Sequence, residues 1–147
     1  MTTNETARSI IQSAGTASLG TISQSGHPFV SLVTIAASSP TTLVMLLSGL
    51  AKHTQYLMND GRCCLLVTDP QSESTDPLAG ARVSVIGHAT RLPRGDDATE
   101  RAVFLDRHPS AGMYADFEDF AFFRFQVEQG HLVAGFGRIE TLQLDQF

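Results

Sequence analysis

ASLGTISQSGHPFVSLVTIAASSPTTLVMLLSGLAKHT, residues 17–54, holds three runs of apolar and β-branched residues, each of which ends in a turn or break signal. Glycine, serine and proline separate the runs, as they do in short turns between strands. Strands that follow one another through short turns pair antiparallel. The segment therefore predicts an antiparallel meander with strands over 17–23, 29–37 and 42–48, followed directly by a helix.

The rest of the chain adds short helices and further strands to this meander. Apolar residues that recur every three or four positions predict helices, and strict alternation predicts strands. The polar segment 69–80, with two prolines, predicts a surface loop, and residues 129–130 read as the turn of a final hairpin. The predicted helices cover 3–14, 50–58 and 97–107, with a helical turn over 109–114. The further strands cover 63–68, 82–90 and 120–128, and the returning side of the final hairpin covers 131–135 and 138–144.

Length and patterning predict a single domain over residues 1–147. A chain of 147 residues can bury one sizeable core and is too short for two ordinary domains. Closing an antiparallel sheet of six or seven strands into a small barrel removes its exposed edges. The sequence thus predicts an α+β fold, with a small barrel and short helices at the connections.

Composition excludes several classes of protein. No apolar run approaches the roughly 18 residues of a membrane helix, and the polar N-terminus shows no export signal. A net charge of −5 with scattered basic residues argues against nucleic acid as a partner. Cys63 and Cys64 are adjacent and would point to opposite faces of a strand, so we expect reduced thiols. These features predict a cytoplasmic protein that binds neither nucleic acid nor membrane.

Residues 48–54 combine the features of a small anion site. A strand ends at Ser48, Gly49 permits a tight turn, and a helix begins there. Amide groups at a helix N-terminus carry partial positive charge, to which Lys52, the only lysine, adds a full charge. Ser48 and Thr54 can donate hydrogen bonds, so a phosphomonoester suits the segment. The alternative is that both hydroxyls only cap the helix and that Lys52 is a surface charge.

Other patterns that carry chemistry are missing. The five histidines include no pair at the i, i+4 spacing of a helical metal site, and no Cys-x-x-Cys occurs. No Gly-x-Ser-x-Gly elbow occurs, and Gly135 and Gly137 lack the third glycine and the helix of a dinucleotide fingerprint. The sequence therefore predicts no protein-bound metal and leaves catalytic residues unassigned.

Five segments in a fixed order resemble the pyridoxamine 5'-phosphate oxidase-like, FMN-binding split barrels. Within that superfamily, the chain is most similar to the branch related to haem-utilisation proteins, through its elements Leu50-Ala51-Lys52-His53-Thr54, Arg107-His108-Pro109 and Gly135-Phe136-Gly137-Arg138. The five segments, which together span nearly the whole chain, are residues 15–36, 46–67, 76–92, 106–125 and 131–142.

The resemblance implies a homodimer of split β-barrels with FMN at the interface between the two copies. It implies that the second strand and the second helix hold the phosphate, and that strand backbone supports the ring. The positions that match the family's cofactor contacts are Ser31, Val33 and Thr34 on the second strand, Lys52, His53 and Thr54 at the helix, and Arg82 at the start of the fifth strand.

Two of these positions depart from the oxidases proper. Ser31 stands where the oxidases have an arginine, and His53 stands where they have a lysine. An imidazole, with an ordinary pKa of about 6.5, is only partly protonated at neutral pH, so a weak phosphate cage is expected. The longer haem-degrading relatives have an extension past the last strand that supplies an iron-ligating histidine, whereas this sequence stops at Phe147. Haem breakdown is therefore not the expected activity.

Three functions remain open at this point. The first is an FMN-dependent oxidoreductase of a small substrate, in which the cofactor supplies the redox chemistry and Arg82 tunes it. The second is a haem-binding or haem-utilisation protein that uses the same dimer cleft, with His108 or His131 as a candidate iron ligand. The third is a structural dimer without a ligand. FMN is the first expectation for the cofactor, and haem and a deazaflavin are the alternatives.

Overall fold

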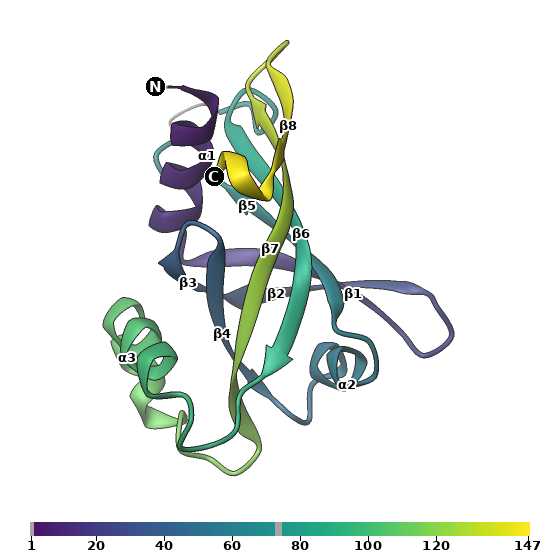
Figure 1. Ribbon diagram of the computed structural model, residues 1–147, viewed down its shortest axis with the longest axis vertical. Helices are drawn as coiled ribbons and strands as arrows, with labels where there is room; N and C mark the ends of the chain where they lie inside the picture. The colour runs from purple at the N-terminus through teal and green to yellow at the C-terminus, as the bar shows by residue number, and fades with distance from the viewer. Residues whose placement is uncertain (1, 73–74) are drawn as a thin grey trace.

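The computed structural model describes residues 2–72 and 75–147 (Figure 1). None of the helices in these residues is long and apolar enough to cross a bilayer. In chain order the elements are α1 (Thr3–Ser13), β1 (Thr16–Ile22), β2 (Pro28–Thr34), β3 (Ala36–Ser39), β4 (Thr42–Ser48), α2 (Lys52–Asn59), β5 (Arg62–Thr68), β6 (Ala81–Arg91), α3 (Ala98–Arg107), η1 (Pro109–Met113), β7 (Phe120–Ala134), β8 (Ile139–Gln143) and η2 (Leu144–Gln146).

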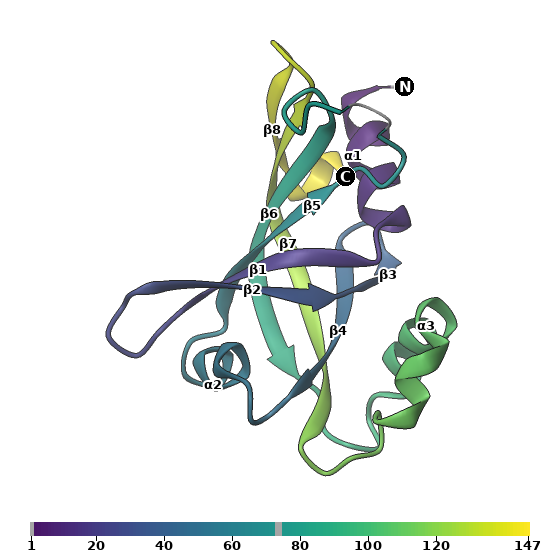
Figure 2. The same ribbon diagram turned by 180° about the vertical axis from the view of Figure 1, so that it is seen from behind.

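All of these strands belong to one antiparallel sheet that curls on itself. The order is β2-β1-β5-β6-β7-β4-β3, and β8 pairs with the second half of β7. The strands at the two ends of this order, β2 and β3, are consecutive in the chain and only Ile35 separates them. The sheet therefore returns to its starting point through a corner of the chain (Figure 2). This architecture confirms the α+β split β-barrel, with eight strands in the described residues instead of six or seven.

The corner at Ile35 divides the strand predicted over 29–37. The Ile35 amide donates to the Gly15 carbonyl oxygen at 2.9 Å, and His108 Nε2 lies 2.8 Å from the Ile35 carbonyl oxygen. Both backbone groups thus bond to segments outside the sheet. The pairing of β2 with β1 therefore ends at Thr34, and the pairing of β3 with β4 begins at Ala36. The prediction of one continuous strand was wrong because these partners are distant in the sequence.

The final hairpin turns later than predicted. β7 continues through Gln129 and Gly130, where the sequence suggested a turn, and both residues pair with β8. A Cβ on Gly130 would lie 2.4 Å from the Phe147 ring, so glycine here admits that ring against the strand. The actual turn contains Gly135 and Gly137, whose φ angles of 94° and 79° favour glycine.

The other predicted elements are found within two residues of their expected ends. The surface loop predicted over 69–80 joins β5 to β6, and residues 73 and 74 of this prediction lie outside the described residues. The predicted strand boundaries were therefore wrong where a long-range contact, at Ile35 or Gly130, changes the local structure.

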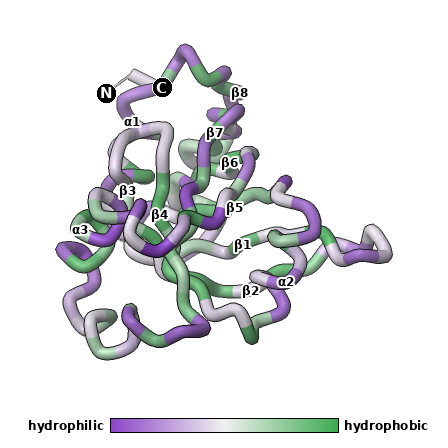
Figure 3. Tube along the Cα trace, turned by 60° about the horizontal axis from the view of Figure 1, so that its bottom comes forward, coloured by the Kyte–Doolittle hydropathy of each residue, from purple (hydrophilic) through white to green (hydrophobic). Residues whose placement is uncertain are grey.

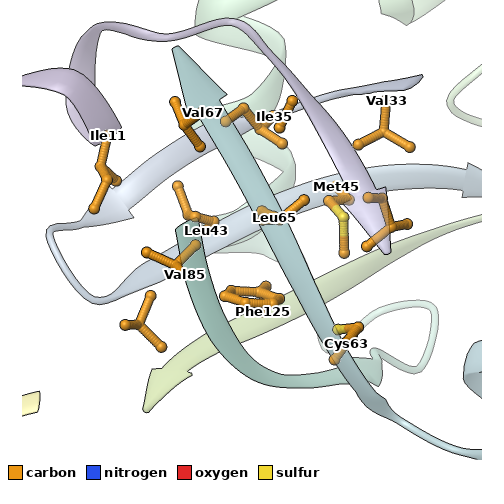
Figure 4. Packing of buried hydrophobic residues seen from close by; sticks show 14 of the residues in the cluster. Ile11, Val33, Ile35, Leu43, Met45, Cys63, Leu65, Val67, Val85 and Phe125 are labelled. Carbon is orange, nitrogen blue, oxygen red and sulfur yellow. The ribbon is translucent and has the colours of Figure 1, made fainter. Parts of the chain in front are cut away.

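The concave face of the sheet holds the main hydrophobic core. Leu43, Met45, Leu65, Val85 and Phe125 are fully buried there (Figure 4). Burying side chains of this size stabilises the fold by about 1.5–3 kcal/mol each. α1 covers this core at one end of the barrel, and α2 packs against β1, β2 and β6 at the other (Figure 1).

A smaller core lies on the convex face of the sheet, under α3. Phe104 of α3 contacts Phe122 of β7 with 5.8 Å between ring centroids, and Val44 and Leu46 of β4 complete the cluster. In Figure 3, hydrophobic segments follow β2 and β4, whereas the tip of the β1–β2 hairpin is hydrophilic. β4 is thus buried on both faces along most of its length.

Candidate functional site

A groove of about 340 Å³ lies between β2, the end of β4 and the start of α2, and is hereafter the β2–α2 groove. Val33, Thr34, Ser48 and His53, four of the residues predicted to bind a cofactor, line it together. The remaining lining residues are Thr16, Leu32, Leu46, Leu47, Ala51 and Phe120. The groove is therefore mainly apolar, with a polar edge at the start of α2.

The N-terminus of α2 opens onto this groove. The Gly49 amide donates to the Asp119 carbonyl oxygen, which turns the chain after β4. A Cβ on Gly49 would lie 3.3 Å from that oxygen, so glycine fits the close approach. Ala51 occupies the N-cap position, and no side chain caps the helix. The first amides of α2 are therefore available to an anion or to the polar edge of a ligand.

His53 and Ser31 form a pair beside the groove. The His53 Nδ1 and Ser31 Oγ atoms lie 3.0 Å apart, which links α2 to β2. Burial lowers the pKa of the half-buried imidazole of His53 below its ordinary value. The imidazole is thus predominantly neutral at neutral pH, and Ser31 adds no charge. The two residues that depart from the oxidase pattern therefore contact each other, and neither supplies a permanent cation.

The two hydroxyls predicted to bind an anion have other surroundings. Ser48 Oγ donates to Asp119 Oδ2 at 2.9 Å and accepts from the Leu50 amide at 3.2 Å. Thr54 is buried and lines a different cavity, and its Oγ1 has no hydrogen-bond partner among the described residues. Only Ser48 therefore lines the groove, and a carboxylate already accepts its proton.

The two predicted cationic contacts are not among the lining residues. Lys52 is exposed in the first turn of α2, between the lining residues Ala51 and His53. Arg82 lies at the start of β6, and its guanidinium donates to the carbonyl oxygens of Leu78 and Gly80 at 3.0 and 3.2 Å. The structure thus places Lys52 at the edge of the groove and Arg82 in a separate region, beside the loop after β5.

The lining of the groove, as far as the described residues show it, carries no permanent charge. Neither lysine nor arginine occurs among its lining residues within the described chain, and the carboxylate of Asp119 lies behind Ser48. Sequence reasoning missed the apolar wall formed by Leu32, Leu46 and Phe120. The alternation of apolar residues along β2 and the aromatic start of β7 were the signals that could have found it.

A second cavity, of about 390 Å³, lies on the other side of the junction between β4 and α2, and is hereafter the barrel-mouth pocket. The core residues Leu47 and Phe123 contribute its apolar part. Its polar lining residues include Thr54, Arg91, Glu118 and Asp119. One short segment of chain therefore separates an apolar groove from a charged pocket.

The histidines offered from sequence as iron ligands lie elsewhere. His108 bonds to the Ile35 carbonyl oxygen, and its ring centroid lies 4.8 Å from that of Phe104. His131 is on β7, with its Nδ1 3.4 Å from Thr141 Oγ1. Nowhere in residues 2–72 and 75–147 do three or more His, Cys, Asp or Glu side chains gather as a metal site would require. His53 is the histidine that lines the β2–α2 groove.

Known proteins resemble this chain over most of its length. It is 31% identical over 134 residues to the chloroplastic non-canonical heme oxygenase HOZ of Arabidopsis thaliana. The aligned residues cover 89% of this chain and 40% of HOZ. The structure of a heme binding protein from Mycobacterium smegmatis has a TM-score of 0.93 and 32% identity, covering 99% of this chain and 60% of that chain. The chain therefore spans about two fifths of the length of HOZ and three fifths of the M. smegmatis chain.

Two further matches show the fold and the family. A Clostridium acetobutylicum protein of the pyridoxinephosphate oxidase family, related to general stress protein 26, has a TM-score of 0.74 at 15% identity, covering 97% of this chain and 95% of that chain. This likeness confirms the split-barrel fold that the sequence resembled. The family model described as CREG, beta-barrel matches residues 1–147. The chain therefore belongs to the CREG beta-barrel family.

Proposed function

We propose that this chain binds haem in the β2–α2 groove. The observation that carries the proposal is the groove wall, in which Leu32, Leu46 and Phe120 form an apolar slot without a lysine or arginine among the described lining residues. Apolar sites with a few placed polar groups suit a large flat ring such as a porphyrin. HOZ and the M. smegmatis protein, both named for heme, support the same ligand here.

The residues present fit the separate parts of a haem. The ring would pack on the apolar wall, and the propionates would meet the uncapped amides of α2 and the charge of Lys52. His53 offers an imidazole inside the groove. When bound, the haem iron would supply ligand-binding and redox chemistry, while this chain orients the ring and excludes water from one of its faces.

A second copy of the chain is the proposed cover of the groove. The volume of about 340 Å³ is near the small end of ligand sites, so a porphyrin would extend beyond it. Leu32, which lines the groove, is 76% exposed and continues onto the open convex face of the sheet. A ligand seated here would therefore remain partly exposed in a single copy.

The convex face next to the groove carries two rows of uncharged residues. The strand register aligns Val30, Gly20, Cys64 and Ile86 across β2, β1, β5 and β6. The side chains of Val30 and Ile86 are exposed. Apolar patches of this kind mark interaction sites, and two copies can pair such a face with itself across a two-fold axis. We therefore propose a homodimer that shares the ligand; the second row is Leu32, Ser18, Leu66 and Ser84.

FMN is the second candidate ligand, in a flavin-dependent oxidoreductase. The observation in its favour is the uncapped N-terminus of α2 beside Lys52, an arrangement that suits a phosphomonoester. The Ser31–His53 pair, however, presents neutral groups where a phosphate dianion gains most from cations. We therefore expect FMN to bind more weakly than haem.

Parallel titrations with haemin and FMN test the ligand. The full chain should shift the Soret band of haemin in a saturable way, and should quench FMN fluorescence only at higher ligand concentration. Saturable FMN quenching without a shift of the Soret band would replace haem by FMN in this proposal. Binding of neither ligand would leave a structural dimer as the function.

A charge placed on the groove rim tests the shared interface. Leu32→Asp introduces a carboxylate at a largely exposed position, so the fold should remain intact while the dimer dissociates and haemin affinity falls. Leu78→Asp, at another exposed leucine, is the matched control and should change neither property. Sedimentation that shows the wild-type chain as a monomer at micromolar concentration, with or without haemin, would contradict the shared cleft.

A further inference from the structure

We propose that His53 is the residue that would bind the haem iron, through Nε2, and that Ser31 is the positioning residue that sets its tautomer. This inference rests on the proposed haem function of the β2–α2 groove. It adds an iron site that involves neither of the histidines suggested from sequence.

The geometry gives His53 one engaged and one free ring nitrogen. His53 is the second residue of α2 and lines the groove, and its Nδ1 lies 3.0 Å from Ser31 Oγ. Nε2 has no hydrogen-bond partner within residues 2–72 and 75–147. The two nitrogens lie on different sides of the imidazole ring, so a bond from Nδ1 to β2 leaves Nε2 directed away from Ser31.

The Ser31 contact is of the kind that prepares a histidine for a metal. A ligating histidine normally donates its other N–H to an oxygen atom, which fixes the tautomer and the ring orientation. Ser31 Oγ can accept from Nδ1–H, which leaves the lone pair on Nε2. Ser31 is uncharged, so the ligand would be a neutral imidazole.

The other histidines of the described chain do not line the groove. His108 is bonded to the Ile35 carbonyl oxygen and packs against Phe104 with its ring tilted by 40°. His27 bonds to the Pro28 carbonyl oxygen in the β1–β2 hairpin. His88 and His131 lie on β6 and β7 and do not line the groove. An iron atom over the apolar wall would therefore meet His53 before any other imidazole of the same chain.

The spectrum of the ferric haemin complex tests whether His53 binds the iron. It is recorded with the full chain in wild-type form and as His53→Ala, His53→Gln and His131→Ala. Wild type and His131→Ala should share one Soret position and one electron paramagnetic resonance signature of imidazole ligation. Both His53 variants should lose that signature, and added imidazole should restore it. Circular dichroism checks that each variant is folded. His53→Gln keeps a side chain able to bond Ser31, so loss of the signature there cannot be assigned to a lost contact with β2.

The role of Ser31 is tested by two further variants. Ser31→Ala should lower haemin affinity by about tenfold, the effect typical of losing the partner of a metal ligand, and should broaden the imidazole signature. Ser31→Thr keeps the hydroxyl and should restore both. Equal affinities and spectra for Ser31→Ala and wild type would overturn the positioning role.

The outcomes separate this inference from the proposed function. A His53→Ala complex with the wild-type spectrum would overturn His53 as the ligand while haem binding stands. A wild-type chain that leaves the Soret band of free haemin unchanged would overturn both.

Discussion

The β2–α2 groove and the barrel-mouth pocket flank the same junction, yet they differ in almost every chemical respect. The groove is apolar, opens on the convex face and holds a half-buried imidazole. The pocket contains Arg91, Glu118 and Asp119 and reaches the core at Phe123. What separates them is the end of β4 and the first turn of α2, in which successive side chains point about 100° apart. His53 lines the groove and Thr54, the next residue, lines the pocket. Neighbours in a motif can thus belong to different sites.

The largest expected effect on stability comes from Phe123, where the barrel-mouth pocket meets the core. Phe123→Ala removes a fully buried ring at the base of the barrel-mouth pocket and should lower the free energy of unfolding by about 3–5 kcal/mol. Phe120→Ala, on the groove side, removes a partly buried ring and should cost less stability but weaken haemin binding. Urea unfolding and haemin titration of both variants measure the difference. Similar losses of both quantities in the two variants would show that the cavities act as one.

The next largest effect on stability should come from the hydrogen bond between Ser48, which lines the groove, and Asp119, which lines the barrel-mouth pocket. Ser48→Ala removes the hydroxyl that donates to Asp119 Oδ2, and hydrogen bonds to charged groups contribute about 1.5–3 kcal/mol, less where the pair is partly exposed as here. We expect a loss of about 1 kcal/mol in urea unfolding. A double-mutant cycle with Asp119→Asn isolates the pair, and additive losses would show that this bond does not couple the two sides.

A gain in stability is expected inside the barrel-mouth pocket. Thr54 Oγ1 is buried without a partner in the described chain, and a buried unpaired hydroxyl costs about 1–3 kcal/mol. Thr54→Val keeps the shape and should therefore stabilise the fold by about 1 kcal/mol, as measured by urea unfolding. Thr54→Ser keeps the hydroxyl, loses a methyl group and should destabilise. A destabilised Thr54→Val variant would show that the hydroxyl has a partner in solution.

The smallest expected effect is a pH dependence on the groove side. Burial lowers the pKa of His53 in the folded state, so the unfolded chain binds its proton more readily. The stability linked to His53 is therefore complete above its ordinary pKa of about 6.5 and decreases as the pH falls below that value. Urea unfolding between pH 8 and pH 5 should show a shallower decline in His53→Gln than in wild type. Equal slopes would mean that His53 is as solvated as in the unfolded chain.

Sequence patterning predicted the strands and helices because most of them follow local rules. Alternation along β5 and helical spacing in α1 need no distant partner to be read. Ile35 and Gly130 differ because Gly15, His108 and Phe147 determine their conformations from far along the chain. Such contacts leave no local signal.

The place of the groove was predictable in part, because a local break in the sequence and the family resemblance both mark it. The resemblance and the break at Gly49 located the groove, since four of the predicted residues line it. The orientation of Thr54, the loop contacts of Arg82 and the partner of Ser31 depend on packing between elements. The sequence therefore indicated the place of the site better than its charge.

The corner at Ile35 also ties the groove wall to two distant segments of the chain. β2 lies at the end of the strand order, and its continuation into β3 passes through one residue fastened to the end of α1 and to His108. Exchange of the Ile35 amide proton requires its bond to Gly15 to open, so hydrogen exchange at this amide reports on opening of the corner directly. A ligand that draws β2 toward α2 would slow that exchange and leave exchange in the middle of β6 unchanged.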